Sequence, residues 1–237
     1  MAYFNGPRIV TDGLVLCLDA ASSKSYPGSG DTWYDLSNRK NNAQLFNSPS
    51  VSSNFFSFNG IDSYGVISSN LKTIIEDSSE FTLLSLANIK EIEHVDNLVG
   101  WGNANSDGGG VVRTFGFYAR NSDLQAMYNH TAQFGGSDLL DKWIFYVSRY
   151  TLTNVYANCY GGVVRANSGS VTGGKTWKEI STSYPITISK TSYFSRYMHA
   201  DISLIQGYNR FLSDEEVLQN FNAIKGRFNL WIIMDQK

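Results

Sequence analysis

The sequence predicts an all-β sandwich that ends in one short C-terminal helix. Short runs that alternate apolar and polar residues, or that are rich in β-branched and aromatic residues, recur along the whole chain between clusters of Gly, Asn and Ser. Aromatic residues make up 14% of the chain and Pro contributes only 4 residues, a composition that strands favour. Strand patterns do not alternate with helix patterns, which excludes a doubly wound parallel sheet.

The predicted strands follow one another from the N-terminal to the C-terminal part of the chain. Their ranges are 14–19, 57–58, 64–67, 81–89, 98–101, 111–118, 124–128, 143–150, 155–160, 163–166, 186–189 and 201–208. Gly161 and Gly162 separate two of these runs, and we expect a hairpin there because glycine tolerates the positive φ of a tight turn. Clusters of Gly, Ser, Asn and Asp at 102–110 and 167–175 predict surface loops.

One helix is predicted after the last strand. Ser213 followed by Glu216 is a capping box, which places the first turn of the helix directly after Ser213. Lys225 and Gly226 provide the charge and the glycine that are typical of a helix end. The apolar residues of this segment share one face: Val217, Leu218, Phe221 and Ile224. We therefore expect the helix to lie across the sandwich with this face buried.

Length and charge exclude several classes of function. The 237 residues suit one large sandwich domain. Lys and Arg number 19 and Asp and Glu number 21, a formal net charge of -2 that argues against nucleic-acid binding. The longest apolar runs, such as 14–18 and 143–147, fall far short of the roughly 20 residues that cross a bilayer, so no membrane insertion is expected. Residues 1–8 lack the pattern of a secretory signal.

Cysteine and histidine usage gives no sign of a metal or cofactor. Cys17 and Cys159 both lie in apolar alternating runs, which predicts buried free thiols; a disulfide is the alternative. His94, His130 and His199 lie far apart in the sequence, without the spacing of zinc ligands. We therefore predict no cofactor and no metal site, with oxygen-ligated calcium as an unsupported alternative.

Several segments carry motifs that go beyond the strand pattern. They are GPRIVTDGLVLCLDA at 6–20, SYPGSGDTWYDLS at 25–37, FNGIDSY at 58–64, DKW at 141–143 and IQGYNRFLSDEEVLQNF at 205–221. These segments resemble the laminin G-like, concanavalin A-like jelly-roll domains of tailed-phage structural proteins of the cyanophage type. Two departures from that pattern are the replacement of a Gly-Asn-Gly turn by 37–42 and the presence of Asn59 where the family has Asp, which puts calcium binding in doubt.

The resemblance implies a fold, a setting and a function. It implies a concanavalin A-like jelly roll at 9–230, preceded by an N-terminal arm at 1–8 and followed by a tail at 231–237. It also implies a non-enzymatic virion protein, made in the host cytoplasm, that serves as a head fibre, a capsid decoration or a tail-associated adhesion module. Host or environmental glycans are an expected ligand. The first alternative is a carbohydrate-binding lectin domain.

A laminarinase-like glycoside hydrolase is the less favoured alternative. Such enzymes share the jelly-roll class and carry a Glu-x-Asp-x-x-Glu strand, to which Glu91, Glu93 and Asp96 invite comparison. Here the second acid is Glu and the third is Asp, the reverse of the hydrolase pattern, so both side chains differ in length and both carboxyl groups are displaced. Preorganised catalysis tolerates such displacement badly. We therefore expect a charged surface turn and no catalytic residue.

The predicted ligand site is a loop that joins an aromatic residue to polar residues. Sandwiches of this class bind sugars through exposed aromatic rings and neighbouring Asp or Asn side chains. Trp101, Asn103, Asn105 and Asp107 form such a group. The alternative is that Trp101 ends a strand and points into the core.

Both ends of the chain are predicted to contact partners. The apolar residues outside the expected sandwich are Tyr3, Phe4, Trp231, Ile232, Ile233 and Met234. Burying a large apolar side chain contributes about 1.5 to 3 kcal/mol, so these residues favour a homo-oligomer, with a trimer preferred, or docking to other virion proteins. The alternative is that the tail folds back onto its own sandwich.

Overall fold

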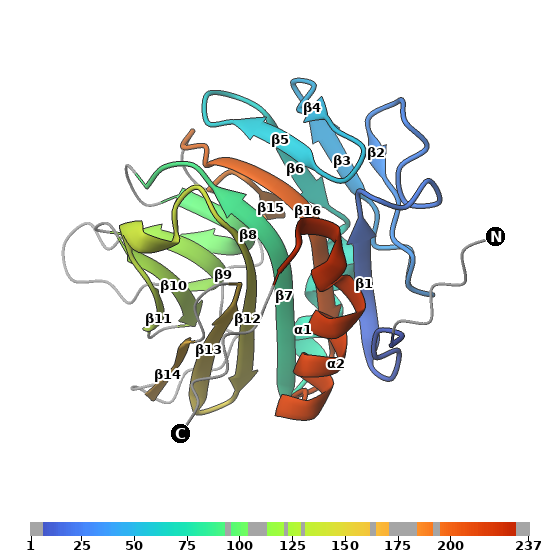
Figure 1. Ribbon diagram of the computed structural model, residues 1–237. Coiled ribbons are helices and arrows are strands. Elements are labelled where there is room, and N and C mark those ends of the chain that lie inside the picture. Colours follow the sequence, from blue (N-terminus) through green and yellow to red (C-terminus); the bar gives the residue numbers. More distant parts are fainter. Residues whose placement is uncertain are drawn as a thin grey trace.

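Two antiparallel sheets form a sandwich in this computed structural model, which describes residues 7–92, 96–103, 113–120, 123–128, 131–161, 165–170, 184–191 and 195–230 (Figure 1). The first sheet contains β1 (Leu14–Asp19), β4 (Ser50–Val51), β5 (Phe56–Asn59), β7 (Glu80–Ile89), β12 (Trp143–Thr151), β13 (Asn154–Tyr160), β14 (Arg165–Ser170) and β16 (His199–Tyr208). The second contains β2 (Thr32–Trp33), β3 (Ala43–Phe46), β6 (Tyr64–Ile67), β8 (Asp96–Asn103), β9 (Arg113–Arg120), β10 (Asp123–Tyr128), β11 (Thr131–Gly135) and β15 (Ile186–Ile188).

The strand order places segments that are distant in sequence side by side. The first sheet runs β14-β13-β12-β7-β16-β5-β4, with β1 also paired to β16. The second sheet runs β11-β10-β9-β8-β15-β6-β3-β2. The predicted all-β sandwich is therefore confirmed. Within the described ranges, no helix is both long and apolar enough to span a membrane.

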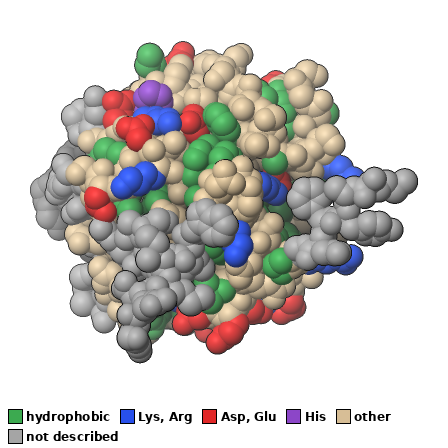
Figure 2. All heavy atoms as spheres, viewed as in Figure 1, with side chains coloured by type: hydrophobic (Ala, Val, Ile, Leu, Met, Phe, Trp, Pro, Cys, Tyr) green, Lys and Arg blue, Asp and Glu red, His purple; other side chains and the backbone are tan. Residues whose placement is uncertain are grey.

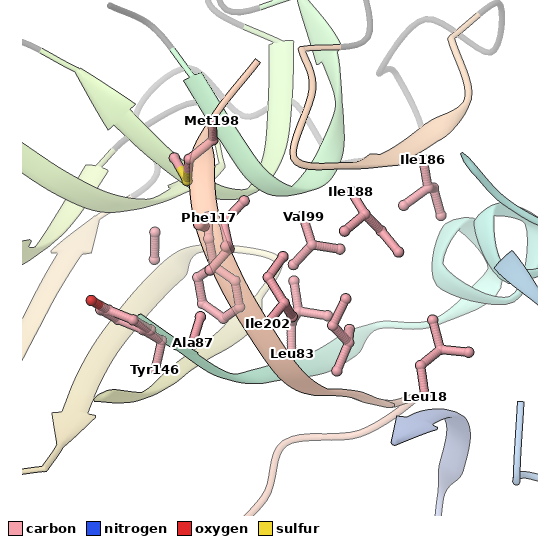
Figure 3. Packing of buried hydrophobic residues seen from close by; sticks show 14 of the residues in the cluster. Leu18, Leu83, Ala87, Val99, Phe117, Tyr146, Ile186, Ile188, Met198 and Ile202 are labelled. Carbon is pink, nitrogen blue, oxygen red and sulfur yellow. The ribbon is translucent and has the colours of Figure 1, made fainter. Parts of the chain in front are cut away.

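The main core lies between the two sheets, and its residues follow the two-residue period of the strands. In β7, Phe81, Leu83 and Ala87 point toward the second sheet, while Leu84 and Leu86 belong to a separate apolar cluster on the outer face. Figure 3 shows side chains from both sheets meeting in the main core: Leu83, Ala87, Tyr146, Ile202, Val99, Phe117 and Ile188. Strand β7 of the first sheet is thus buried on both faces.

The predicted C-terminal helix, α2 (Asp214–Ile224), covers the outer face of the first sheet (Figure 1). Ser213 and Glu216 form the predicted capping box. The side chains of Val217, Phe221 and Ile224 are buried, whereas Leu218 is only partly buried.

Polar contacts fix the position of this helix. Arg149 in β12, whose side chain is 8% exposed, donates to Asp214 Oδ1 at 2.6 Å and to the carbonyl of Leu212 at 3.1 Å. Asn220, which the apolar pattern did not indicate, is buried and accepts a 2.7 Å hydrogen bond from the backbone N–H of Val10. The sheet thus supplies both apolar and polar partners to the helix.

Several local features differ from the sequence predictions. A second helix, α1 (Ser69–Asp77), follows β6 and packs Leu71 and Ile75 into the core. The chain continues past Gly226 as the 3-10 helix η3 (Lys225–Phe228), and Asn229, at φ 51°, makes the left-handed end. Residues 167–170, expected in a loop, belong to strand β14, which pairs with β13 as the predicted hairpin requires. A short 3-10 turn, η1 (Ser137–Leu139), precedes β12.

Cys17 and Cys159 are buried and form no disulfide, as predicted. Burial, assisted by the carboxylate of Asp19, raises the pKa of the Cys17 thiol to about 12. Because the thiolate is the nucleophile, we expect Cys17 to stay unmodified when the native protein is treated with iodoacetamide at pH 8, and to react after denaturation in urea. Mass spectrometry of the alkylated peptides measures this, and labelling of the native protein at Cys17 would contradict the described burial.

Candidate functional site

The structure places Trp101 in the core. Its side chain is 0% exposed and belongs to the main cluster between the sheets, together with Val99 of the same strand. A ring without exposed surface cannot stack on a ligand, so the ligand role predicted for Trp101 is corrected in favour of the inward-pointing alternative. The side chain of Asn103 and the whole of Asn105 and Asp107 lie outside the described residues.

The predicted contact residues at the two ends also lie outside the described residues. They are Tyr3, Phe4, Trp231, Ile232, Ile233 and Met234. Their role in an oligomer or in docking stays a prediction.

Of the three acids that suggested a hydrolase, only Glu91 has a described side chain, because Glu93 and the side chain of Asp96 fall outside the described part. Glu91 Oε1 lies 3.4 Å from His199 Nδ1 at the surface, and Lys90 Nζ lies 3.1 Å from Asp201 Oδ2. Figure 2 shows acidic and basic side chains gathered beside a histidine on the face drawn there. Opposite charges in this group pair with one another.

Asn59, which raised the question of calcium, stabilises its own turn. Its Oδ1 accepts hydrogen bonds from the backbone N–H groups of Ile61 at 2.9 Å, Asp62 at 3.0 Å and Ser63 at 3.1 Å. Among the residues that the structure describes, no group of three or more His, Cys, Asp or Glu side chains is placed to hold a metal ion.

The structure reveals a groove that the sequence pattern did not indicate. It lies where the chain leaves β3 of the second sheet and enters β4 of the first, beside the loop between β1 and β2. Strands β2, β3 and β4 are at the upper right of Figure 1. Its volume is about 580 Å³. The lining residues are Tyr26, Gly30, Asp31, Gln44, Leu45, Phe46, Asn47, Ser48, Pro49 and Phe56. We call it the β3–β4 groove.

Hydrogen bonds to backbone carbonyl groups hold the walls of the β3–β4 groove. The carbonyl of Asp31 accepts from the backbone N–H of Leu45 at 2.6 Å and from Gln44 Nε2 at 3.1 Å. On the other wall, the Tyr26 hydroxyl donates to the carbonyl of Gly30 at 2.9 Å. The groove is thus formed before any ligand arrives, which lowers the entropy lost on binding.

The turn at the rim of the groove has an uncommon backbone conformation. Asn47 and Ser48 have φ angles of 55° and 48°, in the left-handed region that few residues other than Gly adopt. Asn47 Nδ2 donates to the carbonyl of Asp62 at 2.8 Å, which holds the turn against the β5–β6 connection. This turn carries the chain from one sheet to the other and places two polar residues on the rim.

Phe46 provides an aromatic surface in the groove. Its side chain is 38% exposed, and its ring stacks on Tyr64 with a centroid distance of 4.7 Å and an interplanar angle of 10°. Tyr64 is in turn contacted by Lys190, whose Nζ lies 4.3 Å from the ring centroid. Tyr64 therefore packs against one face of the Phe46 ring and helps to fix its orientation.

The chemistry of the β3–β4 groove combines an aromatic surface with hydrogen-bonding groups. Asp31, Gln44, Asn47 and Ser48 supply a carboxylate, two amides and a hydroxyl around Phe46. Such a site can bind a ligand that has one apolar face and a ring of hydroxyl groups. The signal available in the sequence was the alternation in 43–46, where Ala43 and Leu45 are buried and Phe46 points outward.

Comparisons with known proteins support the fold of the chain but assign it to no family. No protein-family model matches the chain, and no curated protein matches it. Among solved structures, it is similar to Trypanosoma rangeli sialidase in complex with the inhibitor DANA, with a TM-score of 0.67 and 20% identity over 93% of this chain and 36% of that chain. It is also similar to the receptor binding domain of botulinum neurotoxin mosaic serotype C/D, with a TM-score of 0.58 and 12% identity over 90% of this chain and 50% of that one.

These comparisons bear on two expectations. A mutant of the Trypanosoma rangeli sialidase that displays trans-sialidase activity matches with a TM-score of 0.64, 19% identity and 34% of that chain covered. The expectation that the chain is not an enzyme is therefore corrected, because the fold is shared with enzyme chains and gives no ground for that exclusion. The structures named here are not phage proteins and add nothing to the phage resemblance. The chain spans about a third of the length of the sialidases and shares with them the two-sheet jelly-roll sandwich.

Proposed function

We propose that this chain binds carbohydrate and holds a sugar ring in the β3–β4 groove. The observation that carries the proposal is the half-exposed ring of Phe46, supported by Tyr64 and surrounded by the polar side chains of Asp31, Gln44 and Asn47. A pyranose has apolar C–H groups on one face and hydroxyl groups around its edge. The groove offers a partner to each of these two parts.

The structural neighbours support the same class of ligand. The sialidase structures are described as complexes with the inhibitor DANA and with sialic acid. In those proteins a sandwich of this architecture forms part of a chain that recognises a sugar. We carry this over to the present chain as a glycan ligand of unspecified type.

The sequence resemblance supplies a setting for this proposal. We propose that the chain acts in a phage particle as an adhesion module that is held by other virion proteins and contacts glycans on the host or in its surroundings. Mass spectrometry of purified particles, with the copy number of the chain per particle, tests the setting. Absence of the chain from the particles would contradict it.

Replacing Phe46 with alanine should weaken glycan binding at least tenfold. Loss of an aromatic contact of about 1.5 kcal/mol corresponds to roughly that factor in Kd. A glycan array selects the ligand, and isothermal titration calorimetry then compares the wild type with Phe46→Ala and Phe46→Tyr. Phe46→Tyr retains the ring and should bind like the wild type.

Leu152→Ala is the matched control for this experiment. Leu152 is 42% exposed, close to the 38% of Phe46, and does not line the groove. Its replacement should leave the Kd unchanged. Binding by Phe46→Ala at wild-type strength, or an array without any bound glycan, would overturn the proposed function.

A further inference from the structure

We propose that the β3–β4 groove selects uncharged sugars and discriminates against sugars that carry a carboxylate, an inference that rests on the proposed glycan binding. The ligands of the sialidase neighbours are acidic sugars, so the structural similarity alone would suggest the opposite preference. The charges around the groove carry the inference.

The lining of the groove contains a carboxylate and no positively charged side chain. Asp31 is exposed, and the other lining residues include no Lys, Arg or His. Proteins bind carboxylates chiefly through Arg and Lys, and Arg offers two parallel hydrogen bonds to the two oxygens. A carboxylated sugar would find no such partner among the lining residues and would meet a group of its own charge.

A second carboxylate lies next to the rim. Asp62 accepts the Asn47 side-chain hydrogen bond through its backbone carbonyl at 2.8 Å, and its Oδ1 accepts from Asn59 Nδ2 at 2.8 Å. The backbone of Asp62 thus contacts the turn that forms the rim, and Asn59 holds its carboxylate. Asp31 and Asp62 place two carboxylates at this end of the sandwich.

Lys190 contacts the tyrosines behind Phe46 and is not a lining residue of the groove. Lys190 Nζ lies 4.3 Å from the ring centroid of Tyr64 and 5.6 Å from that of Tyr197. It stabilises the tyrosine that supports Phe46.

An uncharged sugar can form hydrogen bonds with the Asp31 carboxylate, which would repel a carboxylated sugar. Sugar hydroxyl groups donate to a carboxylate in charge-assisted hydrogen bonds, which are stronger than neutral ones. The Asp31 side chain accepts a long hydrogen bond, 3.4 Å from Thr32 Oγ1, and a ligand hydroxyl can approach it more closely. Asp31 therefore both attracts hydroxyl groups and repels anions.

The test compares three forms of each sugar: the hexose, the corresponding hexuronate, and the hexuronamide, which matches the hexuronate in shape but has no charge. We expect the hexose and the hexuronamide forms to bind and the hexuronate form to bind at least tenfold more weakly. We expect this ratio to shrink when NaCl is raised from about 50 mM to about 500 mM, because salt screens exposed charges. Asp31→Asn should weaken hexose binding and bring the hexuronate and hexuronamide to within about threefold of each other.

Asp141→Asn is the control, since Asp141 has a 74% exposed side chain outside the groove lining and its replacement should leave the ratio unchanged. Hexuronate binding that equals or exceeds hexuronamide binding, or a ratio that Asp31→Asn does not alter, would overturn this inference while the proposed function stands. Failure of all three forms, together with an array free of bound glycan, would overturn the proposed function and this inference with it.

Discussion

Replacing Phe221 with alanine should lower the free energy of unfolding by about 3 to 5 kcal/mol. Phe221 is the centre of the contact between α2 and the first sheet. Its side chain is 0% exposed, and its ring centroid lies 5.9 Å from that of Phe145 and 5.7 Å from that of Tyr160. Removal of the ring leaves a cavity between elements that hydrogen bonds hold in place, so the site can collapse only in part.

Urea denaturation followed by tryptophan fluorescence measures this change. Asn222 lies on the exposed side of the same helix, and Asn222→Ala should change the free energy of unfolding by less than about 0.5 kcal/mol. Equal stability of Phe221→Ala and Asn222→Ala would show that α2 does not stabilise the sandwich.

Replacing Gly116 with alanine should destabilise the protein by at least about 3 kcal/mol, the range that strain and overpacking reach. Gly116 lies in β9 opposite Gly100 of β8, at a φ of +131°. A Cβ added there would lie 2.1 Å from the carbonyl oxygen of Val99 and 2.6 Å from the Cα of Gly100. Both contacts are with backbone, so the two strands would have to separate.

Gly226→Ala is the control for this substitution. A Cβ at Gly226 meets no atom within 4 Å, and its φ is not in the left-handed region. We expect Gly226→Ala to be neutral or slightly stabilising, because alanine restricts the unfolded chain. A melting temperature of Gly116→Ala close to that of Gly226→Ala would contradict the described pairing of β8 and β9.

Elements with a strong local signal could be predicted from the sequence. β1 and β6 have the bounds that their apolar runs indicate, and α2 starts directly after Ser213 because the capping box is a local interaction. Helix α1 has a weaker signal. Thr73, Ile74 and Ile75 are β-branched and favour strands, whereas the burial of Leu71 and Ile75 against the sandwich favours the helix.

The candidate site was harder to predict because exposure depends on strand register. Trp101 precedes a polar cluster and suggested a binding loop, but its strand pairs with β9 so that Trp101 lies opposite Phe115 and points into the core. Phe46 belongs to a short strand that was not predicted, and it faces outward because Ala43 and Leu45 occupy the inner face. The groove also needs the loop at 26–31, which only the folded chain brings next to β3.

Glycan binding in the β3–β4 groove is tested most directly by titrating the ¹⁵N-labelled protein with a glycan selected on the array and mapping the chemical-shift changes. We expect the largest shifts on the amides of Asp31, Gln44, Phe46 and Asn47, and we expect Phe46→Ala to abolish them at the same glycan concentration. Shifts that instead concentrate in 96–103, or around Glu91 and His199, would place the binding site elsewhere and refute glycan binding in the β3–β4 groove.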